Sequence, residues 1–73
     1  MIELNDTQRA LADRMFHNIA REYKGDMRGA LAYARETALL HSEMIAAGVS
    51  HDHTALAIYS NIADRFERML GED

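Results

Sequence analysis

The chain of 73 residues contains no cysteine, no proline and no tryptophan, and only one valine. Without cysteine it can have neither disulfides nor thiolate metal ligands, and nothing in the composition indicates an oxidising compartment. No stretch approaches the roughly 20 apolar residues of a membrane span, and the N-terminus lacks a basic segment followed by an apolar run. We therefore expect one cytoplasmic domain over residues 1–73, with no insertion into a membrane.

The scarcity of valine and the twelve alanines favour helix over strand. Helix-starting residues are Asn5, with Gln8 in the spacing of a capping box, Asp26 and Ser50, and a glycine follows each apolar segment. Because the connections are short, successive helices should be antiparallel. The sequence predicts an all-α fold, an antiparallel three-helix bundle with helices at about 6–24, 26–47 and 51–70.

The helix expected at 26–47 is apolar on two sides. One stripe comprises Met27, Leu31, Ala34, Ala38 and Ile45, and the other comprises Ala30, Tyr33, Leu40, Met44 and Ala47. A helix with two apolar sides is expected in the middle of a bundle.

The helix expected at 51–70 carries a heptad seam with further apolar residues beside it. An apolar core in so small a chain supplies only about 3–5 kcal/mol, and association of two copies is a common way to bury more. We expect a homodimer joined largely through this helix, with helix 26–47 as the alternative surface. The predicted interface residues are Ile58, Tyr59, Ile62, Phe66 and Met69. The competing interpretation is a stable monomer in which the other two helices cover this one on both sides.

Charge is unevenly distributed. Residues 1–35 carry six basic and five acidic side chains, whereas residues 36–73 carry two and seven, and neither Lys nor Arg occurs between Arg35 and Arg65. Four arginines of the first half stand seven residues apart, and two helices could bring them into one square: Arg14, Arg21, Arg28 and Arg35. Such a square would be a partner-binding surface for acidic protein groups or for phosphates. The alternative is a solvated face neutralised by nearby acids.

The segment Gly48–Val49–Ser50 resembles the turn of helix-turn-helix proteins, which implies DNA binding by the residues after it. The exposed side of "SHDHTAL" has no Arg, Lys, Gln or Asn, however, and Asp52 would repel the phosphate backbone. We predict that residues 50–56 do not bind duplex DNA. They are better suited to a helix cap, with His51 and His53 on the surface.

Metal binding and catalysis find no support in the pattern. Two of the four histidines, His51 and His53, point in opposite directions if the segment is helical, and the others lie at different levels of the bundle. His41 should be half-buried and hydrogen-bonded. No serine or threonine has a glycine-rich elbow or an identifiable base, and no glycine loop suits a phosphate. We expect neither metal nor cofactor, and no enzymatic activity.

The remaining interpretation is a small non-catalytic protein-binding module, such as a regulator, inhibitor or adaptor, that acts through helix surfaces. The alternative is a nucleic-acid-binding regulator that uses the arginines of the first two helices.

Overall fold

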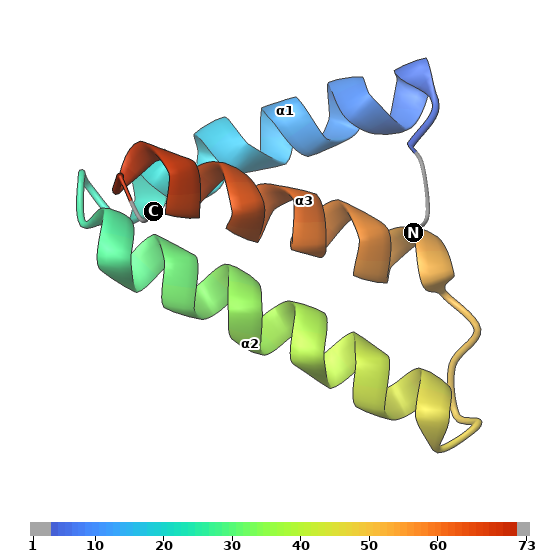
Figure 1. Cartoon of the computed structure of the whole chain (residues 1–73). Coiled ribbons are helices and arrows are strands. Elements are labelled where there is room, and N and C mark those ends of the chain that lie inside the picture. Colours follow the sequence, from blue (N-terminus) through green and yellow to red (C-terminus); the bar gives the residue numbers. More distant parts are fainter. Residues whose placement is uncertain (1–3, 72–73) are drawn as a thin grey trace.

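The structure, a computed structural model, describes residues 4–71 and consists of three α-helices (Figure 1). They are α1 (Asp6–Glu22), α2 (Met27–Ala46) and α3 (His53–Met69). The predicted all-α three-helix bundle is confirmed, and no predicted helix end is more than two residues away from the observed one. Within residues 4–71, no helix is both long and apolar enough to cross a membrane.

The first two helices begin at the predicted caps. The side chain of Asn5 accepts a hydrogen bond from the backbone N–H of Gln8 (2.8 Å), and the side chain of Gln8 accepts one from the backbone N–H of Asn5 (2.9 Å). Asp26 caps α2 by accepting a bond from the N–H of Gly29 (3.1 Å). Each cap satisfies a backbone donor that the first turn of a helix leaves free.

The start of α3 was predicted wrongly. Its cap is Asp52, whose carboxylate accepts a hydrogen bond from the N–H of Ala55 (2.9 Å), and not Ser50. Ser50 instead accepts a bond from the N–H of Asp52 (3.2 Å) inside the connection. The connection runs from the end of α2 to Asp52 because the N-terminal end of α3 lies well away from the C-terminal end of α2, as Figure 1 shows. Gly48, with a φ of +77°, makes the turn that ends α2.

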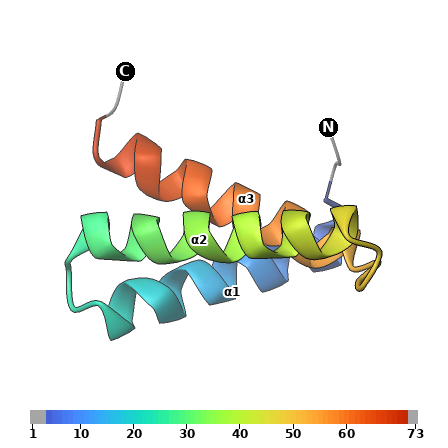
Figure 2. The same cartoon turned by 90° about the horizontal axis from the view of Figure 1, so that it is seen from below.

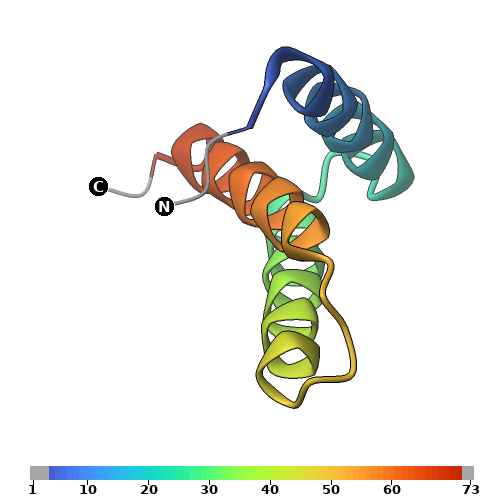
Figure 3. The same ribbon diagram turned by 90° about the vertical axis from the view of Figure 1, so that its right-hand side faces the viewer.

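The core is centred on α3. Ile62 and Phe66 are fully buried, with 0% of their surface exposed, and the ring of Phe66 packs on that of Phe16 with centroids 4.6 Å apart. The buried stripe of α1 consists of Ala12, Phe16 and Ile19. In Figure 3, α3 lies between α1 and α2, which pack on it from two sides and barely meet each other. The central helix is therefore α3, and the prediction that helix 26–47 lies in the middle is wrong.

Only the first half of α2 contributes buried residues, namely Ala30, Leu31 and Ala34. The small side chains of Ala30 and Ala34 allow α2 and α3 to approach closely there. Figures 1 and 3 show α2 diverging from α3 toward the connection at 47–52. Figure 2 shows α1 and α2 joined by their short connection at the opposite end of α2. The second half of α2 consequently has no fully buried side chain.

We expect the substitution Ile62→Val to lower the free energy of unfolding by about 1 kcal/mol, because it removes a fully buried methyl group. Urea unfolding followed by circular dichroism measures this change. The matched control is Val49→Ala, because Val49 is 72% exposed and its truncation should leave stability unchanged within about 0.5 kcal/mol. Equal losses in the two variants would contradict the position of the core.

Candidate functional site

The four arginines predicted to form a square are not brought together. Arg14 and Arg21 project from α1 on the side opposite its buried stripe. Arg28 and Arg35 share a stripe on the flank of α2 that faces α3, where Arg35 forms an ion pair with Glu67. The two pairs thus lie on different sides of the molecule, separated by α3. This arrangement lacks the clustered basic surface that would favour a phosphate backbone.

The residues predicted to join two copies lie mostly inside one chain. Ile58, Ile62 and Phe66 are buried in the core, and Tyr59 is half-buried against it. Of the five, only Met69 is an exposed side chain. The seam of α3 is occupied by α1 and α2, as in the competing monomer interpretation, so a second copy would have to pack on another surface.

A partly exposed, mostly apolar stripe of regular spacing lies on α2. We call it the α2 seam; its members follow one another at intervals of four and three residues: Tyr33, Thr37, Leu40, Met44 and Ala47. Tyr33, Leu40 and Ala47 are exposed and the other two half-buried. The hydroxyl of Thr37 donates a hydrogen bond to the backbone carbonyl of Tyr33 (2.8 Å), so it is already satisfied. Intervals of four and three are typical of a helix face that packs against another helix.

The α2 seam faces the open side of the molecule between α2 and α1. At one end the ring of Tyr33 lies 6.0 Å from that of Tyr23, which ends α1, and beyond this contact the two helices separate (Figure 3). On α1, exposed Leu11 and half-buried Met15 lie on the edge of the buried stripe that is turned toward this open side. Apolar side chains of both α1 and α2 are therefore exposed on this side of the molecule.

An aromatic cluster supports the base of the α2 seam. Its rings are those of Tyr23, Tyr33, Tyr59 and His41, with successive centroids 6.0, 6.5 and 5.7 Å apart. Burial, and secondarily the neighbouring Tyr33, raises the pKa of Tyr59 above its usual range. His41 is half-buried as predicted and stacks on Tyr59, but its Nδ1 atom is buried without a hydrogen-bond partner. The predicted hydrogen bond is therefore absent at Nδ1, and an unsatisfied atom of this kind costs about 1–3 kcal/mol.

Acidic side chains border the α2 seam. Glu36 and Glu43 are the neighbours of Leu40 one turn before and one turn after it, and both are exposed. Across the open side, Glu22 shares the edge of α1 that carries Leu11. Within residues 4–71, none of these three glutamates forms an ion pair. The apolar surface therefore has an acidic border whose carboxylates form no ion pair with a basic residue among residues 4–71.

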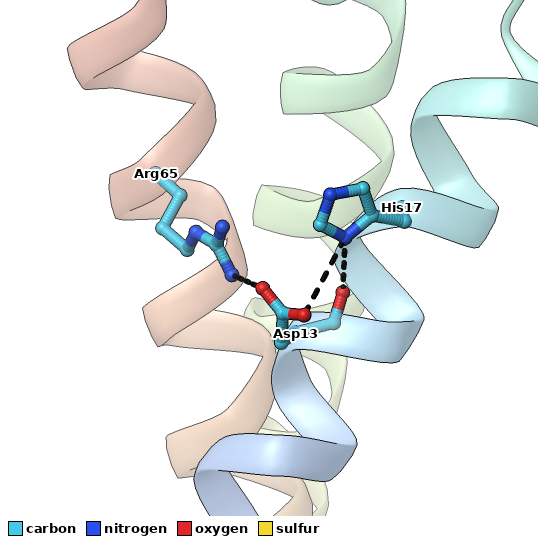
Figure 4. Close-up of polar contacts among 3 residues, drawn as sticks. All are labelled: Asp13, His17 and Arg65. Atoms are coloured by element: carbon cyan, nitrogen blue, oxygen red, sulfur yellow. Dashed lines mark hydrogen bonds and ion pairs between the residues drawn. The ribbon is translucent and has the colours of Figure 1, made fainter.

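A depression lies on the other side of α1. It is a groove of about 850 Å³ between α1 and α3, and its lining mixes apolar residues with three arginines and two aspartates: Leu4, Arg9, Asp13, Leu56, Ala57, Ser60, Asn61, Asp64, Arg65 and Arg68. Here the guanidinium of Arg65 donates to Asp13 (3.0 Å) and lies over the ring of Phe16, 4.0 Å from its centroid. Asp13 also lies close to His17, whose Nδ1 is 2.8 Å from the backbone carbonyl of Asp13 (Figure 4). The two contacts of Arg65, with Asp13 and with Phe16, join α3 to α1.

Sequence reasoning missed the pairing of Asp13 with Arg65. The two residues are separated by 52 positions, and neither belongs to a motif, so no local signal connects them. The pairing of Arg35 with Glu67 was missed for the same reason.

Histidines and carboxylates do not assemble into a metal centre anywhere in the described part of the chain, where no three of them lie close enough to share an ion. The turn with His51 and His53 is exposed, and the residue between them caps α3. No nucleophile lies in a described contact with a base.

Comparisons of the chain with known protein families, with curated proteins and with solved structures find no match.

We expect Arg65→Ala to lower the free energy of unfolding by about 1–2 kcal/mol, because it removes both the ion pair and the contact with the Phe16 ring. Asp13→Asn, which removes only the ion pair, should cost less than about 1 kcal/mol. Urea unfolding provides both values, with Arg68→Ala as the control for loss of an exposed arginine from the same groove. If Asp13→Asn cost as much as Arg65→Ala, the contact with Phe16 would contribute nothing.

Proposed function

We propose that this protein is a small non-catalytic protein-binding module, a regulator, inhibitor or adaptor, that holds its partner on the α2 seam. The observation that carries the proposal is that the seam has the residue spacing of a helix-packing face, yet Tyr33, Leu40 and Ala47 remain exposed on it. A contiguous exposed apolar surface bordered by charges is typical of interaction sites. A cytoplasmic location, in keeping with the absence of cysteine, belongs to the same proposal.

The surface has the composition of a binding site. Tyrosine and methionine are enriched where proteins meet, and Tyr33 and Met44 are both members of the α2 seam. Tyr33 is supported from behind by the rings of Tyr23 and Tyr59, which restrict its position before a partner arrives. A side chain that is already ordered loses less conformational entropy on binding.

Two neighbouring leucines provide a matched test. Leu40 belongs to the α2 seam and is 54% exposed, whereas Leu39 is 60% exposed but lies about 100° around the helix, outside the seam. Leu40→Glu should abolish capture of the partner from an extract of the cells that produce the protein, and Leu39→Glu should leave capture intact. Both variants should keep the helicity and thermal stability of the parent, because neither side chain is in the core.

The partner is identified with a photo-crosslinking residue placed at position 40, with the same residue at Arg14 as the control on the outer side of α1. Mass spectrometry should find one discrete crosslinked protein from position 40 and none in common from position 14. Capture that survives Leu40→Glu, or that is lost equally in Leu39→Glu, would refute the proposal.

A further inference from the structure

We propose that the segment bound on the α2 seam is an amphipathic helix of the partner protein, with basic residues beside its apolar stripe. This inference rests on the proposed function and adds the secondary structure and the charge of the ligand. Three observations carry it: the spacing of the seam, the length and openness of the surface, and the unpaired glutamates along its border.

The spacing of the α2 seam favours a helix as the bound segment. Side chains at intervals of four and three form ridges and holes that receive the side chains of a second helix, whereas an extended strand presents residues at intervals of two. From Tyr33 to Ala47 the seam is about 21 Å long at 1.5 Å per residue, which corresponds to about four helical turns. A helix of this length would lie along the exposed side chains of the seam, Tyr33, Leu40 and Ala47.

The acidic border of the α2 seam favours basic residues on the flanks of the bound helix. Glu22, Glu36 and Glu43 have no ion-pair partner within residues 4–71, and the sequence has neither Lys nor Arg from residue 36 to residue 64. A helix with Lys or Arg beside its apolar stripe would place cations next to these carboxylates. Complementary charge of this kind fixes the register and discriminates against other partners.

The same charges disfavour a second copy of the chain as the occupant. A two-fold antiparallel pairing of α2 about Leu40 would set Glu36 of each copy opposite Glu43 of the other. Four carboxylates would then meet in two like-charge pairs, which destabilises the contact. A second copy could also place the outer face of its α1, where Arg14 and Arg21 lie, on the α2 seam. That face has too few exposed apolar residues to cover the seam.

The test uses two synthetic helical peptides of the same length and the same leucine stripe, one with Lys and the other with Glu beside the stripe. Binding is measured by fluorescence anisotropy and located by the backbone amide shifts of the labelled protein. We expect the Lys peptide to shift amides between Tyr33 and Ala47 and to bind at least about tenfold more tightly than the Glu peptide, and we expect this preference to weaken with salt. Leu40→Glu should remove binding, and Leu39→Glu should not.

A charge swap gives the sharpest outcome. The double variant Glu36→Lys with Glu43→Lys changes two exposed side chains outside the core and should reverse the preference, so that it favours the Glu peptide. Equal binding of the two peptides, binding of neither, shifts confined to the groove between α1 and α3, or self-association of the protein that Leu40→Glu abolishes would each overturn the inference. Its failure is distinguishable from failure of the proposed function: a native partner captured through Leu40 by an acidic or extended segment would refute the inference and leave the function standing.

Discussion

The burial of Ile62 and Phe66 on α3 is the contact on which the rest of the structure depends. Full burial of side chains this large contributes about 1.5–3 kcal/mol each, a substantial share of the stability of a chain of this size. Because the side chains of Ile62 and Phe66 lie between α1 and α2, both helices pack on α3 and have little contact with each other. The open side of the molecule, and with it the uncovered face of α2, follows from that choice of central helix.

The local features of the fold were predictable from the sequence, and the tertiary arrangement was not. Capping depends on residues three positions apart, so Asn5 with Gln8 and Asp26 could be read directly. Ser50 and Asp52 are both good caps, and only the path of the connection decides between them. The two apolar stripes of α2 were visible in the sequence as well. A stripe, however, shows that a face is suited to packing, not that the same chain supplies the neighbour.

The unequal distribution of charge indicates one thing about partners in the sequence alone and a further thing once the fold is known. The absence of Lys and Arg between Arg35 and Arg65 argues against nucleic acid when the sequence is considered alone. In three dimensions it leaves Glu36 and Glu43 unpaired beside Leu40, whereas the arginines of α1 and α2 lie elsewhere on the surface. The same distribution of charge thus disfavours nucleic acid and, under the proposed function, favours a partner segment with basic residues.

The missing core contacts in the second half of α2 also bear on its motions. A helical segment whose side chains are at most half-buried is held less firmly by tertiary contacts, and such segments open locally at a lower free energy than the rest of a domain. Amide protons there should exchange with solvent through brief fraying from the Gly48 end, while those near Ile62 and Phe66 exchange only when the whole chain unfolds. Whether the C-terminal turns of α2 stay helical would then depend on what packs against them as much as on their own sequence.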